Sequence, residues 1–303
     1  MENSLPKIIV IVGPTASGKT DLAIKIAKKF DGEIISADSR QVYKGMNIGT
    51  GKVTKKEMAG IPHHLLDVAS PRRTFTVAHY QKLGSAAIKK ILSKGKLPII
   101  VGGTGFYIDT LLYNYNLPSV KQNLKLRHEL EKKSAEELFN KLKKLDPRRA
   151  ETIDRHNKVR LIRAIEIVIA TKKPVPKLAL WQSQGESQYN FLKIGVKIGP
   201  KKLKERIKKR LMARFKDGMT EEVKMLRKKG LSWKKLDSFG LEYRFISRSL
   251  RRIISKKEME ETLEQEIWKY SKRQMTWFRK DKKIKWVKKE SEAFRLTKPF
   301  LSE

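Results

Sequence analysis

The chain has 303 residues and carries 69 Lys and Arg against 32 Asp and Glu, which gives a net charge of +37. This excess goes far beyond what solubility requires, so we expect a polyanionic partner, with a generally basic proteome as the alternative cause. No apolar run approaches the roughly 20 residues of a membrane-spanning helix, which favours nucleic acid over a membrane. The sequence has no cysteine, and this excludes disulfides, thiolate nucleophiles and zinc sites built on cysteine.

The first expected strand, Ile8 to Val12, runs directly into the phosphate-loop pattern G-x-x-x-x-G-K-[ST]. Backbone N–H groups of such a loop bind phosphate, Lys19 adds a charge that reaches along the phosphate chain, and the Thr20 hydroxyl can bind Mg²⁺. An amphipathic helix follows, and its N-terminal dipole favours the same anion. The pattern does not distinguish a reacting phosphate from a leaving group. The expected phosphate-binding residues are Gly13, Pro14, Thr15, Ala16, Ser17, Gly18, Lys19 and Thr20.

A second polar cluster, Asp38 to Gln41, follows the next apolar run. Asp38 has two functional interpretations: it holds a water of a bound Mg²⁺, as in kinases and ATPases, or it acts as a general base toward an acceptor. A strand-end cap is the structural alternative. The Arg and Gln side chains that follow suit contacts to purine edges. Asp67 ends a further expected strand and competes for the metal role.

The third cluster is the glycine-rich turn Gly102 to Gly105, which again follows an expected strand. Glycines here allow close approach of the backbone to a ligand, and Thr104 offers a hydroxyl toward the same cleft. By itself this pattern is a weak indication of function.

Alternating apolar runs and helical stretches in the first third predict an α/β fold with a parallel sheet flanked by helices. We expect a P-loop NTPase-like core whose first part spans 1–120, a helical insertion domain at 121–190, and completion of the core with basic C-terminal helices at 191–303. The first apolar stretch is used by a strand, so no signal peptide is expected, and a cytoplasmic protein is the expectation. Expected strands are Ile8 to Val12, Glu33 to Ala37, His64 to Asp67, Leu97 to Val101, Phe191 to Ile198 and Lys285 to Val287. Expected helices include Tyr80 to Leu92, Leu124 to Lys132, Ala135 to Leu145, Lys158 to Ala170, Leu203 to Phe215, Glu221 to Lys228 and Met259 to Arg279.

Taken together, four motifs resemble those of the tRNA dimethylallyltransferases, also called tRNA isopentenyltransferases. They are GPTASGKT, DSRQVYKGMNIGTGK (Asp38 to Lys52), IPHHLLDV (Ile61 to Val68) and VGGTGFYI (Val101 to Ile108). The resemblance continues in Asp146 to Ala150, in Arg160, Arg163, Ala164 and Glu166, and in Lys272 to Arg279, so it covers nearly the entire chain. One departure is Gly240 to Arg244, which stands where many members carry a Gly-Tyr pair.

The resemblance implies transfer of a dimethylallyl group from dimethylallyl diphosphate to the N6 amine of adenosine 37 in tRNA. It implies Lys19, Asp38 and Thr104 as catalytic residues, with Asp38 as the general base, and Mg²⁺ on Thr20 as the cofactor. The alternatives are an enzyme that prenylates free adenine nucleotides, which needs no large basic arm, and a P-loop phosphotransferase or ATP-dependent nucleic-acid binder.

The expected partners are the anticodon arm of tRNA and dimethylallyl diphosphate, with no membrane, and we expect a monomer. A basic stripe on the C-terminal helix, Lys269, Lys272, Arg273 and Lys280, suits a phosphate backbone and lies opposite Leu263, Ile267, Tyr270 and Phe278. By the resemblance, the tRNA-binding residues are Asp38, Ser39, Arg40, Gln41, Thr104, Arg127, Val159, Arg160, Leu161, Ile162 and Arg163.

Overall fold

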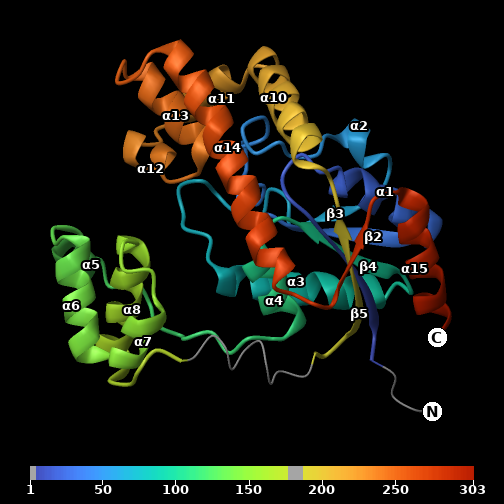
Figure 1. Cartoon of the computed structure of the whole chain (residues 1–303), viewed down its shortest axis with the longest axis horizontal. Coiled ribbons are helices and arrows are strands. Elements are labelled where there is room, and N and C mark those ends of the chain that lie inside the picture. Colours follow the sequence, from blue (N-terminus) through green and yellow to red (C-terminus); the bar gives the residue numbers. More distant parts are fainter. Residues whose placement is uncertain (1–4, 177–186) are drawn as a thin grey trace. The chain divides into compact units, whose positions relative to one another are not determined.

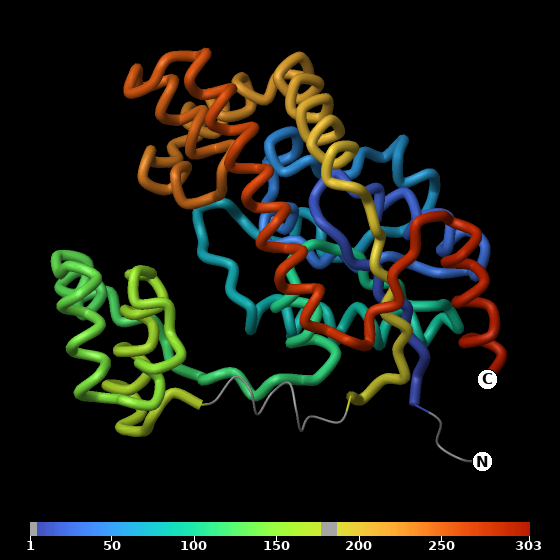
Figure 2. Tube along the Cα trace, in the orientation of Figure 1, coloured from blue at the N-terminus to red at the C-terminus, as the bar shows by residue number. Residues whose placement is uncertain are grey.

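The structure is a computed structural model, and it describes residues 5–176 and 187–303. The chain divides into two compact units: a core unit, residues 1–114 and 187–303, and an insertion unit, residues 115–186. The two units are drawn in Figures 1 and 2. Residues 177–186 of the expected insertion domain lie outside the described residues.

The core unit contains one six-stranded sheet in the order β3-β2-β4-β1-β5-β6. All of its strand pairs are parallel, which confirms the expected sheet type. Strand β1 is apolar throughout its buried length because both of its faces are covered by helices. The strands are β1 (Lys7–Val12), β2 (Gly32–Ala37), β3 (His63–His64), β4 (Leu97–Gly102), β5 (Asn190–Val196) and β6 (Ile284–Val287).

Alternating residues of β1 contribute to two different hydrophobic cores. Ile9 and Ile11 pack with helices α1 (Lys19–Lys29) and α15 (Glu290–Ser302). Ile8 and Val10 pack on the opposite face with α3 (Val77–Leu92) and α4 (Gly105–Leu112). The sheet is therefore sandwiched between two helical layers, as Figure 1 shows.

A third core joins the C-terminal helices to the loop after β2. Val42, Tyr43 and Met46 are buried among these helices, so they fix the course of the segment that begins at Asp38. The long helix α14 runs from this cluster to α4. The helices are α10 (Pro200–Lys216), α11 (Met219–Lys228), α12 (Trp233–Asp237), α13 (Leu241–Leu250) and α14 (Lys256–Arg279), and the loop itself contains the short α2 (Lys55–Met58).

The insertion unit is helical in its described part. Apolar residues of its helices, among them Leu138, Leu142 and Leu161, form a separate core. Ser134 caps α6 through a reciprocal capping box with Glu137, as a Ser-x-x-Glu pattern indicates. Its helices are α5 (Leu124–Glu131), α6 (Ala135–Leu145), α7 (Pro147–Thr152) and α8 (Lys158–Thr171).

Two expectations about local structure are wrong. The strand expected from His64 to Asp67 ends at His64, because Leu65 and Asp67 take left-handed φ angles of 66° and 55° that a strand cannot contain. Tyr270, placed on the apolar side of the C-terminal helix, is 38% exposed and packs its ring against Arg273. Leu263, Ile267 and Phe278 are buried as expected.

Candidate active site

The phosphate loop follows β1, the strand at which the sheet order reverses between β4 on one side and β5 on the other. Ligands of open α/β sheets bind at such switch points. The loop ends at the N-terminus of α1, where the helix dipole favours an anion. Ser17 is buried, and its Oγ has no hydrogen-bond partner among the described residues. The loop therefore retains polar groups for a ligand.

A cavity of about 1000 Å³ lies beside this loop. Pro14, Ser17 and Gly18 line it from the loop, and its other walls come from α1, α10, α14, α15, β5 and β6. Its size suits a small-molecule ligand.

Lys19 lies in a strongly positive environment. Its Nζ donates to the Pro14 carbonyl at 3.2 Å. Burial and the nearby Arg210 lower the pKa of Lys19 to about 8, although the Asp38 carboxylate opposes this shift. Two cations are thus held side by side, which is favourable only when an anion compensates their charge.

Arginines at every fourth position of α10 reach the loops of the site. Arg206 donates to the Ser17 carbonyl at 3.2 Å, Arg210 to Gly51 at 3.1 Å and Arg214 to Gly49 at 3.4 Å. Burial and the neighbouring Arg214 lower the pKa of Arg210 to about 10. The sequence-based prediction missed these residues. Their four-residue spacing on an expected helix was the available signal, since it places them on one face.

Asp38 and Thr104 lie close together at the carboxyl ends of β2 and β4. Asp38 Oδ1 accepts from the backbone N–H groups of Arg40 at 2.8 Å and Gln41 at 3.3 Å, which orients the partly exposed carboxylate. Thr104 Oγ1 accepts from the Ser39 backbone N–H at 3.3 Å. The structure therefore joins the second and third polar clusters of the sequence.

The segment after Asp38 is fixed by a buried carboxylate from α11. Glu222 accepts from the backbone N–H groups of Asn47, Ile48 and Gly49 at 2.7–3.0 Å, and from the Tyr243 hydroxyl at 2.7 Å. These bonds hold a loop whose backbone would otherwise need water. Tyr243 belongs to Gly240 to Arg244, the segment that departs from the family pattern. Its hydroxyl bonds to Glu222 and thus helps to hold the loop after Asp38.

The side chains of Arg40 and Gln41 are placed differently. The Arg40 guanidinium lies beside Gly240. A Cβ added to Gly240 would lie 3.5 Å from Arg40 Nε. Gln41 Nε2 donates to the Gly51 carbonyl at 3.1 Å. Gln41 is therefore engaged within the loop itself.

Asp67 forms an ion pair with Lys52 at 2.6 Å. Lys52 also donates to the Tyr43 carbonyl at 2.9 Å, so Asp67 is part of the packing of this loop. Within residues 5–176 and 187–303, no group of three or more His, Cys, Asp or Glu side chains could hold a metal ion. A cation at Thr20 would thus take most of its ligands from phosphate oxygens and water, an arrangement that Mg²⁺ commonly adopts.

The glycines of the third cluster make room for α14. A Cβ on Gly103 would lie 2.1 Å from Gln274 Nε2, and one on Gly105 would lie 2.2 Å from the Trp277 ring. The expectation was that these glycines allow approach of a ligand. The structure instead fills the adjacent space with side chains of the C-terminal helix.

In the insertion unit, Glu166 is 1% exposed and organises two of the expected tRNA-binding residues. Arg127 pairs with it through two hydrogen bonds of 2.9 and 2.7 Å, and Arg163 through one of 2.5 Å. Burial opposes its charge, but the hydrogen bonds from Arg127 and Arg163 hold the pKa of Glu166 at about 2. Arg127 and Arg163 are thus tied into the unit itself.

The run Val159 to Arg163 divides between surface and core. Val159 and Arg160 are exposed on the first turn of α8. Leu161 and Ile162 are 0% and 7% exposed and belong to the hydrophobic core of the unit. Their side chains therefore support the helix, while Arg160 presents its charge to solvent.

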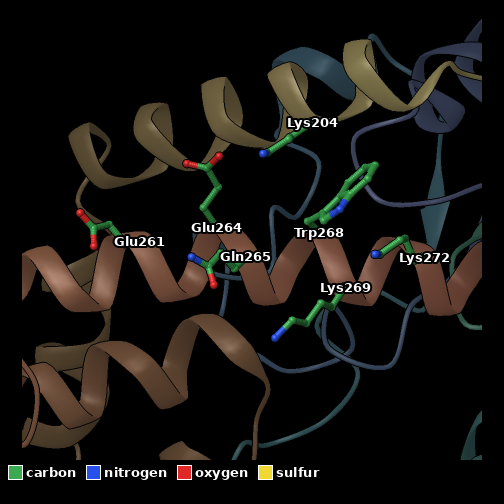
Figure 3. A pocket seen from close by; sticks show the side chains of 7 residues that line it. All are labelled: Lys204, Glu261, Glu264, Gln265, Trp268, Lys269 and Lys272. Atoms are coloured by element: carbon green, nitrogen blue, oxygen red, sulfur yellow. The ribbon is translucent and has the colours of Figure 1, made fainter.

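A groove between α10 and α14 carries part of the expected basic stripe (Figure 3). Lys204 comes from α10, and Lys269 and Lys272 come from α14; the Trp268 ring rises from α14 toward α10, whereas Lys269 points away from α10. Glu261 and Glu264 lie along the same groove, so its charge is mixed.

The parallel sheet, with a phosphate loop after its central strand, defines a P-loop NTPase-like α/β protein. The model of the IPP transferase family matches residues 41–281, and the chain belongs to this family. It is 43% identical over 290 residues to the tRNA dimethylallyltransferase of Acetivibrio thermocellus, covering 94% of this chain and 93% of that protein. The corresponding protein of Anoxybacillus flavithermus is 42% identical, with 92% and 89% covered.

Solved structures agree with this assignment. The full-length tRNA isopentenylpyrophosphate transferase of Bacillus halodurans superimposes with a TM-score of 0.74 and 35% identity, over 98% of this chain and 97% of that one. A eukaryotic dimethylallyltransferase acting on tRNA gives a TM-score of 0.76 at 28% identity, over 90% of this chain and 69% of that one. The resemblance inferred from the sequence motifs is confirmed, and the chain is a prenyl-transferring enzyme of the tRNA dimethylallyltransferases. Among the described residues, no helix is both long and apolar enough to span a membrane.

Proposed function

We propose that this enzyme transfers the dimethylallyl group of dimethylallyl diphosphate to the N6 amine of adenosine 37 in tRNA, with release of diphosphate. The observation that carries the proposal is the convergence of the phosphate loop, Asp38 and Thr104 at the carboxyl edge of one parallel sheet. Pyrophosphate is a leaving group in this reaction, so the loop binds charge that grows as the carbon–oxygen bond breaks.

In this proposal Lys19, Arg210 and backbone N–H groups of the loop other than that of Thr15 bind the diphosphate. Burial and Arg210 lower the pKa of Lys19, burial and Arg214 lower the pKa of Arg210, and a bound anion offsets both effects. Binding both phosphates on the protein leaves the allylic carbon as the electrophile, and carbon is attacked instead of phosphorus.

Asp38 is the proposed general base. The N6 amine of adenine is a poor nucleophile because its lone pair is delocalised into the ring, and it must lose a proton as the new carbon–nitrogen bond forms. Asp38 Oδ1 is held by two backbone N–H groups, so the carboxylate keeps a fixed orientation at the mouth of the site. Thr104, whose Oγ1 is fixed by the Ser39 N–H, contacts the substrate near the reacting atoms.

We propose Mg²⁺ as the cation of this site. The residues fit it, because the loop places the Thr20 hydroxyl in the first turn of α1 and leaves the buried Ser17 Oγ unpartnered in the described structure. When bound, the ion supplies neutralisation of the diphosphate charge. A chelator should therefore reduce transfer, and full activity in its presence would remove this assignment.

The anticodon arm of tRNA is the proposed acceptor-side partner, with Ser39, Arg40 and Gln41 near the target nucleotide. The 35 basic and 15 acidic residues of 191–303 would supply much of the sequence-independent affinity. We propose that the enzyme works as a monomer in the cytoplasm, where its tRNA substrate is found.

The test is to incubate the protein with dimethylallyl diphosphate and unmodified tRNA and to digest the tRNA for mass analysis. The expected result is a dimethylallyl mass gain at adenosine 37. A gain on AMP without a gain on tRNA would instead identify a nucleotide prenyltransferase. ATP hydrolysis or phosphate transfer without any prenyl transfer would identify a phosphotransferase.

A further inference from the structure

Gln274 of α14 connects the phosphate loop to the glycine-rich turn. Its side chain is 7% exposed, its Oε1 accepts from the Thr15 backbone N–H at 2.9 Å, and its Nε2 donates to the Gly103 carbonyl at 3.0 Å. Both partners are backbone groups of fixed polarity, so the orientation of the amide is determined. One buried side chain thus spans two loops that are far apart in the sequence.

The bridge is continuous with the acceptor side of the site. Gly103 directly precedes Thr104, and Thr104 Oγ1 accepts from the N–H of Ser39, the neighbour of Asp38. Hydrogen bonds and two covalent backbone steps therefore connect the loop that binds the leaving group to the proposed general base. The bond to Thr15 also directs that N–H toward α14, so it is not available to the diphosphate.

The Gln274 side chain occupies the space beside Gly103 that a Cβ would need. A Cβ at Gly103 would lie 2.1 Å from Nε2 and 3.3 Å from Cδ of Gln274. The next atom, the Gly13 carbonyl oxygen, would lie 3.7 Å away, which is an ordinary contact distance. Gly103 has no left-handed φ angle, so its backbone accepts alanine. The close contact at this position comes from Gln274 alone.

We propose that Gln274 is a positioning residue for prenyl transfer, which fixes the separation between the phosphate loop and the turn that carries Thr104. This inference rests on the proposed function. The reacting carbon is bound through the diphosphate on one loop, and Thr104 of the other turn contacts the substrate near the reacting atoms. A shift of about 1 Å between them is expected to cost on the order of 100-fold in rate.

The first experiment uses Gln274→Met, which keeps the length of the side chain but makes neither hydrogen bond. Calorimetry with inorganic pyrophosphate should show affinity within about threefold of the wild type, because the remaining loop groups still bind it. The single-turnover rate on saturating tRNA and dimethylallyl diphosphate should fall at least about tenfold. Thr262→Ala is the control on the same helix, since Thr262 does not line the cavity beside the phosphate loop.

A double-mutant cycle with Gly103→Ala gives an independent test. Gly103→Ala alone should slow transfer strongly because its methyl group displaces Gln274. In the Gln274→Ala background the same change should cost less than about twofold. Gly102→Ala is the control, because its Cβ would meet the Ala37 carbonyl oxygen at 2.1 Å, so its effect should persist in both backgrounds.

A wild-type single-turnover rate in Gln274→Met would overturn the positioning role. So would a double variant, Gly103→Ala with Gln274→Ala, whose rate loss equals the product of the losses of the two single variants. A loss of pyrophosphate affinity as large as the loss of rate would also overturn it, since Gln274 would then act on binding. If the wild-type protein itself fails to modify tRNA, the proposed function is what fails. These outcomes separate the two proposals.

Discussion

At the scale of single residues, the site combines two buried cations with a carboxylate that is held in place by the backbone. Lys19 and Arg210 lie together beside the phosphate loop, and burial lowers the pKa of both groups. Asp38 is fixed by the N–H groups of Arg40 and Gln41. Burial of the two cations costs free energy in the free enzyme, whereas the two N–H groups stabilise the carboxylate, and each arrangement has a chemical use in prenyl transfer.

The pKa of Lys19 predicts a pH dependence of diphosphate binding. With a pKa of about 8, Lys19 is charged below pH 8 and neutral above it. Affinity for dimethylallyl diphosphate should therefore be full below pH 8 and fall by up to about tenfold per pH unit above it. Calorimetry between pH 7 and 9.5 measures this directly. Lys19→Gln should bind more weakly with a much flatter profile, and an equally steep decline in that variant would contradict the assignment.

Asp38 predicts a separation of chemistry from binding. Asp38→Asn keeps an oxygen that can accept from the Arg40 N–H, so the loop is preserved, but the amide cannot take a proton. The single-turnover rate should fall by about 10² to 10⁴, while pyrophosphate affinity should change little. Rapid-quench measurement with excess enzyme gives the rate. An unchanged rate would exclude Asp38 as the base. An equal loss in both quantities would show that it acts on binding.

At the scale of elements, α5 and α8 of the insertion unit are joined through one buried carboxylate. Glu166 accepts hydrogen bonds from Arg127, Arg163 and the Asn123 backbone N–H. The two arginines are partly exposed at 24% and 34%, so they can be oriented by Glu166 and still face a ligand. The same ion pairs therefore stabilise the unit and orient the two arginines that are proposed to bind tRNA.

Glu166→Gln should lower the free energy of unfolding of the insertion unit by about 3 kcal/mol, because it removes the buried anion that holds two partly exposed guanidinium groups. Because the folded pKa of about 2 lies below the ordinary 4.5, the stabilisation is present above pH 4.5 and lost as the pH falls toward 2. Hydrogen exchange of α5 and α8 amides in the full chain measures both effects. Glu129→Gln on the exposed face of α5 is the control and should change neither. Equal protection in Glu166→Gln would contradict the role of the cluster.

At the scale of the whole molecule, the charge of +37 matters as a field that attracts a polyanion. Both units contribute to it through exposed basic side chains, such as Arg160 in one and Lys272 in the other. Phosphate contacts of this kind position a nucleic acid without reading its sequence. Sequence preference would then depend on the small region around Asp38.

Affinity for tRNA should fall steeply with salt, since each neutralised phosphate releases a counterion. Arg160→Ala should reduce the slope of log K against log salt by about 0.7 to 0.9, the share of one phosphate contact. Fluorescence titration over a range of salt concentrations measures the slope. Lys298→Ala, an exposed cation on α15, should leave the slope unchanged, and an unchanged slope in Arg160→Ala would mean that this residue makes no phosphate contact.

Much of the fold could be predicted from local patterns. Strand β1, the phosphate loop and α1 follow from an apolar run, a glycine pattern and a helical period, all within 25 residues. The prediction lacks helices α12, α13 and α15. It also extends the strand at His64 to Asp67 too far, because left-handed backbone at Leu65 and Asp67 leaves no mark in an apolar pattern. The prediction for Tyr270 is wrong for a related reason. A helical period shows which face of a helix is apolar, but it does not show how much of that face the packing elements cover.

The sequence by itself determined the phosphate loop, the parallel sheet, the basic charge and, through its four motifs, the family. Only the tertiary structure decided that Arg210 reaches the site and that Gln274 joins Thr15 to Gly103. It also decided that Arg127 and Arg163 are shared with Glu166. Backbone conformation and apolar period depend on neighbours in the chain, so they are visible in the order of residues. The partner of a polar side chain depends on which other element packs beside it, and for Arg210 and Gln274 that element is more than 150 residues away in the sequence.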